Sequence, residues 1–354
     1  MKPTRILGIA KTGGGLAISA VRAIWPLAAL NRRPDFTCMW MKPEDVALKA
    51  NTDEGLQRLQ GYDIYVQVRA NATIEPGKNP MEPFLKDGAA HVYDIDDDLT
   101  GEHRDFGKQR GLTDTVGICD AVTCTNEYLS SQMGRYGKPT YVVPNALDVE
   151  WYEKSSMSTE RDDSVLTIGL VGTPTHFFDW ILVKDALLKI KQEFPEVRIL
   201  CGGYRPAYLE EIADTFYAPV PFMVYPSLLR QLDIRLCPLE NPEKEPFNLS
   251  KSPISALEAM ASSRQIRSGR AGGAVPICSD HPVFRETVQH KQTGLLVKDG
   301  DWYEAIRYVI KNKERREGMA MAGLRWVKKN ASVYQTVDRW AEVYHTILEE
   351  KRDG

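Results

Sequence analysis

Short apolar runs alternate with segments of helical length along the whole chain. In the first part of the sequence, apolar runs at residues 5–10, 62–68, 90–95, 121–125 and 141–143 predict strands. Residues 16–30 have the length and composition of a helix, in which Pro26 predicts a kink or a stop. This alternation predicts a mostly parallel sheet with helices on both faces.

The same alternation restarts after a polar segment. Residues 153–164 (EKSSMSTERDDS) contain almost no apolar side chain and predict a linker or a surface loop. Further strands are predicted at residues 165–171, 197–201, 233–236, 275–278 and 294–297, and late helices at 302–311, 314–329 and 332–350. The pattern predicts an α/β chain of two Rossmann-like domains, 1–150 and 165–330, whose parallel sheets face a cleft. The length of 354 residues also suggests two domains, at roughly 150 residues each.

Composition narrows the class of protein. A net charge of -3, with 43% hydrophobic and 26% charged residues, excludes a disordered acidic chain, a collagen-like repeat and a wholly basic nucleic-acid coat. The longest apolar stretch is broken by Arg22 and Pro26 and falls short of the roughly 20 residues that a membrane span needs. The N-terminus lacks a signal-peptide pattern, and the six cysteines form no CxxC pair. We therefore expect a cytoplasmic protein with reduced thiols and without a membrane span.

A triple glycine follows the first predicted strand. Gly13, Gly14 and Gly15 suggest a dinucleotide fingerprint, but the position that needs its last glycine is Ile18. No Gly-Lys pair in the chain is followed by Ser or Thr, so a P-loop is excluded too. Two interpretations remain: a tight strand-to-helix turn, or a turn that lets a ligand approach the backbone at a helix N-terminus.

Four carboxylates cluster at the end of the predicted strand at 90–95. The sequence there is Asp94-Ile95-Asp96-Asp97-Asp98, and carboxylates this close repel one another unless a cation, protons or solvent intervene. A solvated acidic loop, a lining for the predicted cleft and a divalent-cation site with D-x-D spacing are all compatible with this pattern. No histidine or further carboxylate lies at ligand spacing, which disfavours the metal.

A proline-rich segment at 236–253 leads into a short helix. Ser252 is predicted as its N-cap and Pro253 as its first residue. The free N–H groups at such a helix start, with Lys251 beside them, could bind a diphosphate, and Glu258 further along could accept hydrogen bonds from sugar hydroxyls. The alternatives are a solvated lysine and a surface glutamate.

These motifs together resemble a known family. DIRLCPLENP, PFNLSKSPISALEAMA, GAVPICSD and FRETVQHKQTGLLV, between residues 233 and 297, resemble the C-terminal half of retaining glycosyltransferases of the GT-B fold, family 4. VYDIDDD, DAVTCTNEYLS, VVPNALD and IGLVGTPTHFFD, between residues 92 and 179, resemble further parts of that family. The match indicates a branch with DIDD and FNxxKS motifs.

The resemblance implies a metal-independent enzyme that moves a sugar from a UDP- or GDP-sugar to an acceptor hydroxyl, with retention and without a bound cofactor. The implied donor-binding residues are Gly172, Thr173, Lys251, Ser252 and Glu258. The implied catalytic residues are Asp96, Asp97 and His176, and Gly13, Gly14 and Gly15 would lie on the acceptor side. The helix at 331–354 would pack back on the first domain.

Two departures from the family stand out. The first glutamate of its E-x7-E motif is Ser250 here, which leaves room for a non-catalytic relative that only binds sugar nucleotides or glycans. An insertion at 262–272 adds Arg264, Arg267 and Arg270 without an acidic residue.

The acceptor is not fixed by these residues. A saccharide, a lipid-linked saccharide and a modified DNA base all remain open, and a basic C-terminal surface could also contact anionic lipid headgroups. That surface would comprise the three insertion arginines with Lys311, Lys313, Arg315, Arg316, Arg325, Lys328 and Lys329. The interleaved Glu314 and Glu317 favour a solvated helix face instead.

Overall fold

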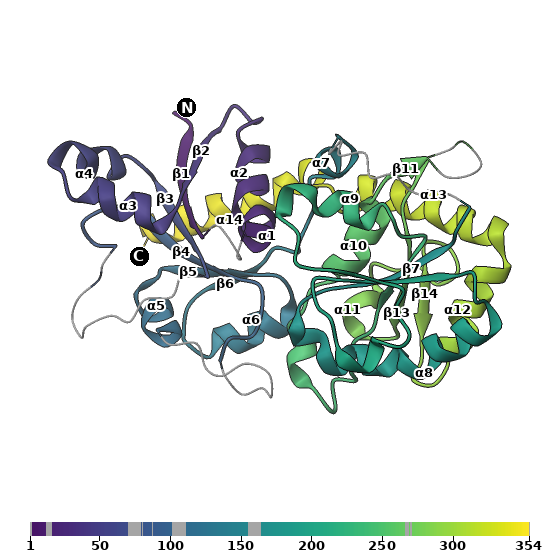
Figure 1. Ribbon diagram of the computed structural model, residues 1–354. Helices are drawn as coiled ribbons and strands as arrows, with labels where there is room; N and C mark the ends of the chain where they lie inside the picture. Colours follow the sequence, from purple (N-terminus) through teal and green to yellow (C-terminus); the bar gives the residue numbers. More distant parts are fainter. Residues whose placement is uncertain are drawn as a thin grey trace. The chain divides into compact units, whose positions relative to one another are not determined.

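Two compact units make up the chain in the computed structural model (Figure 1). The structure describes residues 2–11, 16–69, 79, 81–86, 88–100, 111–154, 164–265, 269 and 271–353. The first unit comprises Met1–Ala146, Leu249–Ser252 and Val333–Gly354, and the second Leu147–Asn248 and Pro253–Ser332. This division differs from the sequence-based boundaries chiefly at 249–252, which belong to the first unit.

The first unit is built on a parallel six-stranded sheet in the order β2-β1-β3-β4-β5-β6. The strands are β1 (Thr4–Ala10), β2 (Phe36–Met41), β3 (Ile64–Val68), β4 (Ala90–Ile95), β5 (Ala121–Cys124) and β6 (Thr140–Val142). The chain reverses its direction of travel across the sheet between β1 and β3. In open α/β sheets, ligands bind beyond the carboxyl ends of strands at such a reversal.

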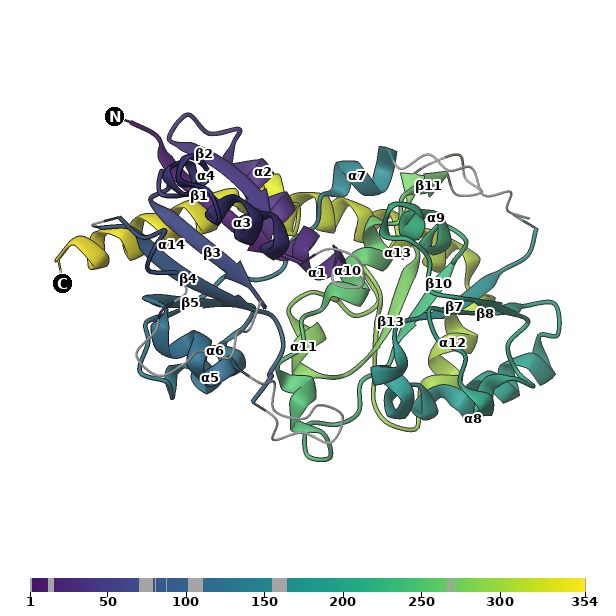
Figure 2. The same ribbon diagram turned by 60° about the vertical axis from the view of Figure 1, so that its left-hand side comes forward.

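Helices cover both faces of this sheet. One face packs against α2 (Trp25–Leu30) and α14 (Val333–Asp353), which lie side by side in Figures 1 and 2. Trp340 and Ile347 of α14 are buried there, and Val343 packs against the same core. The other face is covered by α3 (Pro43–Ala50), α4 (Asp53–Leu59), α5 (Leu112–Ile118) and α6 (Glu127–Gly134). The alternation of β1, with Ile6 on one face and Leu7 on the other, fits a strand buried on both sides.

The first helical segment runs through Pro26 and does not stop there. It consists of α1 (Leu16–Ser19), the π-helical η2 (Ala20–Ile24) and α2. Pro26 falls in the first turn of α2, where its missing N–H costs little because the preceding turn is already widened to π geometry. The expected kink or stop is thus replaced by a local change of helix type.

The second unit has a parallel sheet in the order β14-β13-β10-β7-β8-β9. Its strands are β7 (Thr167–Val171), β8 (Arg198–Gly202), β9 (Thr215–Tyr217), β10 (Ile234–Cys237), β13 (Val275–Ser279) and β14 (Leu295–Val297). Counted from β7, this is the 3-2-1-4-5-6 order of nucleotide-binding Rossmann folds. The reversal, and with it the expected ligand position, lies between β7 and β10.

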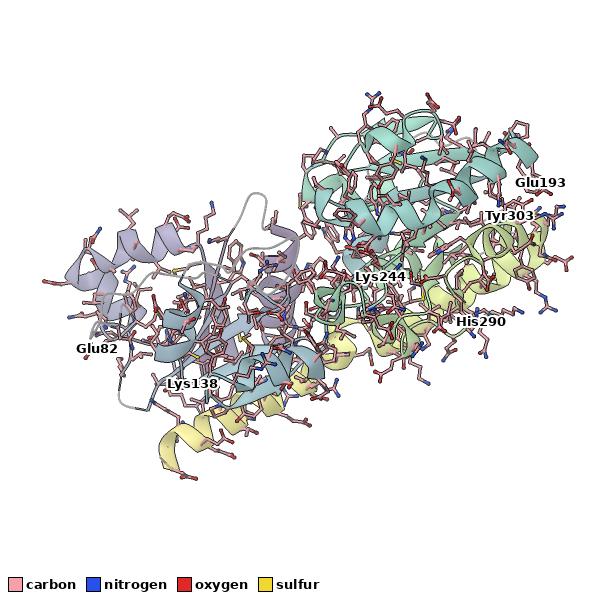
Figure 3. The ribbon with its side chains drawn as sticks, turned by 90° about the horizontal axis from the view of Figure 1, so that it is seen from below. Glu82, Lys138, Glu193, Lys244, His290 and Tyr303 are labelled. Carbon is pink, nitrogen blue, oxygen red and sulfur yellow. The ribbon has the colours of Figure 1, made fainter. Side chains whose placement is uncertain are left out.

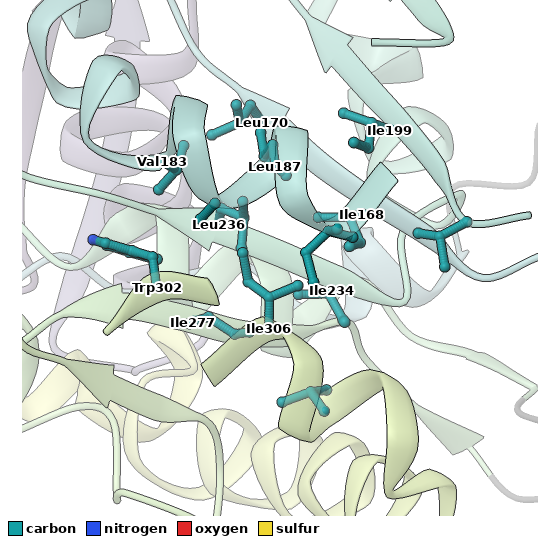
Figure 4. Close-up of a cluster of buried hydrophobic side chains, with 14 of the residues drawn as sticks. Ile168, Leu170, Val183, Leu187, Ile199, Ile234, Leu236, Ile277, Trp302 and Ile306 are labelled. Atoms are coloured by element: carbon teal, nitrogen blue, oxygen red, sulfur yellow. The ribbon is translucent and has the colours of Figure 1, made fainter. Parts of the chain in front are cut away.

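The main core of the second unit lies between this sheet and the helices α8 (Phe177–Glu193) and α12 (Trp302–Lys311) (Figure 4). Ile168 and Leu170 of β7 face Leu187 of α8, while Ile234 of β10 lies close to Ile306 of α12. At the rim of the same helix pair, Tyr303 of α12 donates a hydrogen bond to Glu193 of α8 (Figure 3). With the neighbouring Arg307 and Lys311, this bond lowers the pKa of Glu193 to about 2.

Shorter elements complete the second unit. The helices are α7 (Val149–Lys154), η3 (Pro174–His176), η4 (Ala207–Leu209), η5 (Phe222–Val224), α9 (Tyr225–Leu229), η6 (Pro246–Leu249, whose last residue belongs to the first unit), α10 (Ile254–Ala261), α11 (Pro282–Arg285) and α13 (Lys313–Asn330). The insertion contributes the two-residue strands β11 (Arg264–Gln265) and β12 (Ala271–Gly272), which pair antiparallel. In the described ranges, no helix is both long and apolar enough to cross a membrane.

Five of the six cysteines are buried, and none of the six is in a disulfide. Burial raises the pKa of Cys38, Cys124 and Cys201 to about 12, so these thiols remain protonated at neutral pH.

Candidate active site

Charged side chains gather where β3 and β4 end in the first unit. Arg69 directly follows β3 and adopts a left-handed backbone conformation (φ 45°), in which its N–H donates to the carbonyl of Asp94 at 3.0 Å. Its Nη1 atom lies 3.1 Å from Oδ1 of Asp96 and 3.1 Å from Oδ2 of Asp97. A non-glycine residue in this region is strained, and such strain is concentrated at functional sites. One guanidinium therefore holds both predicted catalytic carboxylates.

The repulsion expected among the clustered carboxylates is relieved by two arginines. Asp94 points into the core, where Nε and Nη2 of Arg22 lie 3.0 and 2.7 Å from its two oxygens and Thr123 donates a further hydrogen bond. Asp96 and Asp97 pair with Arg69 instead. Within the described ranges, no three His, Cys, Asp or Glu side chains are grouped so that they could hold a metal ion.

Asp97 has a shifted protonation equilibrium. Burial and the neighbouring charge of Asp96 raise the pKa of Asp97 to about 6, although Arg69 and Lys251 act in the opposite direction. Its side chain keeps 26% of its surface exposed, so a ligand could still reach it. A carboxylate with this pKa can take up and return a proton near neutral pH.

The segment 249–252 is held by side chains of the first unit. Nδ2 of Asn126 lies 3.1 Å from each of the carbonyl oxygens of Leu249, Ser250 and Lys251. The backbone N–H of Asp98 donates to the buried hydroxyl of Ser250 at 3.0 Å. Lys251 is thus fixed through its backbone, and Ser250 fills a buried position.

The prediction that Ser252 is the N-cap of the helix is wrong. Helix α10 begins at Ile254, Pro253 takes the N-cap position, and no side chain caps the helix. Ser252 Oγ instead accepts a hydrogen bond from Nδ2 of Asn145 at 2.8 Å, so it is turned to that partner and not to the helix.

In the second unit, Gly172 ends β7 at the reversal of strand order. A Cβ atom at this position would lie 2.8 Å from Cδ2 of His176 and 3.2 Å from Cζ2 of Trp180. Gly203 (φ 84°) approaches from β8, where a Cβ would lie 2.4 Å from the carbonyl oxygen of Gly172. Close approach of side chain and backbone thus requires glycine at both positions. Thr173 follows, with its hydroxyl 2.7 Å from that of Thr175.

His176 is held by a buried carboxylate from the first turn of α8. Nδ1 of His176 lies 2.9 Å from Oδ2 of Asp179. The side chain of Asp179 is 5% exposed and that of His176 29%, so the imidazole lies nearer the surface than its partner. Oδ1 of Asp179 accepts two more hydrogen bonds, from the backbone N–H of Glu240 at 2.8 Å and from Nδ2 of Asn248 at 3.2 Å.

Glu258 lies in a buried polar network and is not a free surface side chain. Tyr152 donates to its Oε1 at 3.1 Å, and Tyr225 donates to its Oε2 at 2.8 Å. Nη1 of Arg235 pairs with Oε2 at 2.9 Å. The carboxylate keeps 12% of its surface exposed and has acceptor capacity left on Oε1.

The sequence alone does not indicate several residues of these clusters. Arg69, Asn126, Asp179 and Arg235 are not among the candidates that the sequence suggested. A charged residue directly after a strand marks Arg69, and i,i+3 spacing from His176 on a helix marks Asp179. The partners of Asn126 and Arg235 depend on tertiary contacts. Gly13, Gly14, Gly15, Arg267 and Arg270 lie outside the described residues, while Arg264 pairs with Asp233 at 2.6 Å.

No family model matches the chain, and no curated protein matches its sequence. Solved structures do match its fold. The HepE protein of Anabaena, crystallised with UDP and glucose, superposes with a TM-score of 0.59 at 13% identity, over 97% of this chain and all of that one. Sucrose-phosphate synthase of Thermosynechococcus elongatus gives a TM-score of 0.58 at 12% identity, over 99% of this chain and all of that one.

A UDP-forming α,α-trehalose-phosphate synthase of Burkholderia xenovorans is similar to the same degree, with a TM-score of 0.58 at 12% identity over 99% of both chains. The chain has the GT-B fold. At these identities the likeness concerns the fold, and the fold by itself does not fix the activity.

Proposed function

We propose that the chain is a glycosyltransferase that moves a sugar from a nucleotide-sugar donor to an acceptor hydroxyl, with retention of the anomeric configuration and without a metal. The observation that carries this proposal lies in the second unit. Gly172, His176 and Asp179 gather where the Rossmann strand order reverses, which is the expected position of a nucleotide. The HepE protein of Anabaena, whose structure has a similar fold, was crystallised with UDP and with UDP-glucose.

The donor is bound, in this proposal, by Gly172, Thr173 and Glu258 of the second unit, while Lys251 and Ser252, which the sequence also suggests, belong to the first unit. Bond cleavage between the sugar and the diphosphate builds negative charge on the leaving phosphate. The N–H groups at the start of α10, which no side chain caps, stabilise that charge. The remaining acceptor capacity of Glu258 suits a ribose hydroxyl.

The catalytic carboxylates are Asp96 and Asp97. Asp97 takes the proton of the acceptor hydroxyl, because its pKa of about 6 leaves it largely ionised at neutral pH and still basic enough to share a proton. The negative charge of Asp96 raises the pKa of Asp97, and the positive charge of Arg69 lowers it. The first unit accordingly binds the acceptor, which is a saccharide, a lipid-linked saccharide or a modified DNA base.

A second candidate is a non-catalytic relative that binds a sugar nucleotide or a glycan. The observation that favours it is the engagement of Glu258 by Tyr152, Tyr225 and Arg235, together with serine at position 250. A carboxylate committed to protein partners has less capacity left for a ribose.

One assay separates the two candidates. The purified chain is incubated with UDP-, GDP- and ADP-sugars, alone and with free glycans, lipid-linked sugars or duplex DNA, and release of nucleoside diphosphate is measured. A transferase releases it with at least one donor, and a matching acceptor accelerates the release. A binding protein gives calorimetric heat with a donor but no turnover with any acceptor.

A further inference from the structure

Three hydrogen-bond donors face the carboxylate of Asp179. Its two oxygens face the backbone N–H of Glu240, Nδ2 of Asn248 and Nδ1 of His176, at 2.8, 3.2 and 2.9 Å. An ionised carboxylate only accepts hydrogen bonds, so it matches each of these three donors. The consequence for His176 is that Nδ1 carries a proton, because two acceptors would otherwise face each other.

The fixed proton on Nδ1 determines which atom of His176 a ligand meets. Cδ2 of the ring, which is bonded to Nε2, is the atom closest to the site of a Cβ on Gly172, at 2.8 Å. The Nε2 edge of the ring therefore lies along the end of β7, where the strand order reverses. Glycine at 172 leaves the space that the ring edge needs.

We propose that Asp179 is a positioning residue that fixes the tautomer and the orientation of His176, so that Nε2 meets a phosphate oxygen of the nucleotide-sugar donor. This inference rests on the proposed function. Asp179 also ties the loop between β10 and α10 to α8, since it accepts from Glu240 and Asn248, and Asn248 in turn donates to the carbonyl of Glu240 at 3.1 Å. One carboxylate therefore holds the loop after β7 and the loop after β10, which are the two strands between which the strand order reverses.

The variant Asp179→Asn tests the tautomer directly. The amide has one acceptor oxygen, and the backbone N–H of Glu240 cannot change its role, so the amide turns its NH2 group toward His176. Nδ1 must then accept, and the proton moves to Nε2. Long-range ¹H–¹⁵N spectra distinguish the two tautomers, and loss of one of six histidine signal sets in His176→Gln assigns the resonances.

We expect the Nδ1–H form in the wild type, the Nε2–H form in Asp179→Asn, and a fall in kcat of at least about tenfold with a smaller change in the donor KM. Asp185→Asn, on the exposed side of the same helix, is the matched control and leaves the spectra and kcat unchanged. An Nε2–H tautomer in the wild type overturns the proposal even if Asp179→Asn does not fold.

An unchanged kcat in a folded Asp179→Asn variant overturns it as well. A wild-type chain without turnover of any donor refutes the proposed function instead, and the tautomer spectra still decide whether Asp179 sets the state of His176.

Discussion

Arg22 and Asp94 form a bidentate ion pair, and neither side chain has any surface exposed to solvent. Nε and Nη2 of the guanidinium face the two carboxylate oxygens at 3.0 and 2.7 Å. The remaining Nη1 donates to the carbonyl of Val143 at 2.6 Å and to Oδ1 of Asn145 at 3.0 Å. The pair joins the helical segment 16–30 to the ends of β4 and β6, next to the proposed catalytic carboxylates.

Removal of one partner of this pair should be costly. Asp94→Asn or Arg22→Met leaves a buried group without its counter-charge, and we expect the free energy of unfolding to fall by about 3–5 kcal/mol in urea titrations. The double variant should lose less than the sum of the single losses. Arg58→Met, which removes the exposed pair with Glu54, is the control and should change stability by less than about 1 kcal/mol. An equal loss of unfolding free energy at the buried and the exposed pair would contradict the claim that burial makes the Arg22–Asp94 pair costly to break.

The pH profile of sugar transfer should report Asp97. With its pKa at about 6, the carboxylate is ionised above that pH, so the rate should fall as the pH drops below 6. Asp96→Asn removes a neighbouring negative charge and should shift the acidic limb to lower pH. Arg69→Met removes a positive charge and should shift it to higher pH. Shifts in the same direction for both variants would rule out this assignment.

His91 should make the first unit sensitive to acid. Burial lowers the pKa of His91 to about 4, with Lys138 acting in the same direction and Asp120 opposing it. Nε2 lies 3.0 Å from Oε1 of Gln67, and the whole side chain is buried. The ring is therefore neutral in the folded protein at neutral pH.

Between pH 6.5 and 4, the unfolded chain binds a proton at His91 that the folded chain does not, so stability falls as the pH is lowered through this window. The loss approaches about 3 kcal/mol, since each pKa unit corresponds to about 1.4 kcal/mol. Urea titrations of the wild type and His91→Gln across this range give the difference. Parallel pH dependences in the two proteins would show that another group titrates.

Gly172→Ala should lower the rate of sugar transfer strongly and the stability of the protein only modestly. Its Cβ would lie 2.8 Å from Cδ2 of His176, so the imidazole must move away from the end of β7. We expect a loss of transfer rate of at least about tenfold with a modest loss of stability. Gly318→Ala, in the interior of α13 with nothing within 4 Å of its Cβ, should gain up to about 1 kcal/mol and keep full activity. Full activity in Gly172→Ala would contradict a role for the position of His176.

Apolar runs could be predicted as strands from the sequence, including the short edge strands β6 and β14, whereas β2 and β9 could not. β3 (IYVQV) and β7 (TIGLV) are buried on both faces, so most of their side chains are apolar. β2 was not expected, since it is an edge strand of mixed exposure. Its outer edge is covered by Asn31, whose amide bonds to both the N–H and the C=O of Cys38. β9 has three residues, and only pairing with β8 makes it a strand.

For the candidate site, the sequence indicates which residues could face a ligand but not which side chains they contact. Asp96, Asp97, Gly172 and His176 were suggested because polar or glycine residues at strand ends tend to face ligands. In the sequence, Arg22 only interrupts an apolar segment, because its partner Asp94 lies 72 residues away along the chain. The start of α10 was placed one residue too early because Ser252 has a tertiary partner, Asn145, which the local pattern does not reveal.

The most direct test of sugar transfer is a proton NMR time course of the anomeric signal. The chain is incubated with the nucleotide sugar that gives the highest turnover and with its acceptor, and compared with the double variant Asp96→Asn/Asp97→Asn. We predict that the donor signal of the wild type is replaced by a product signal with the same anomeric configuration, and that the double variant is at least about a hundredfold slower. An unchanged donor signal in the wild type, or equal rates in both proteins, would contradict the account.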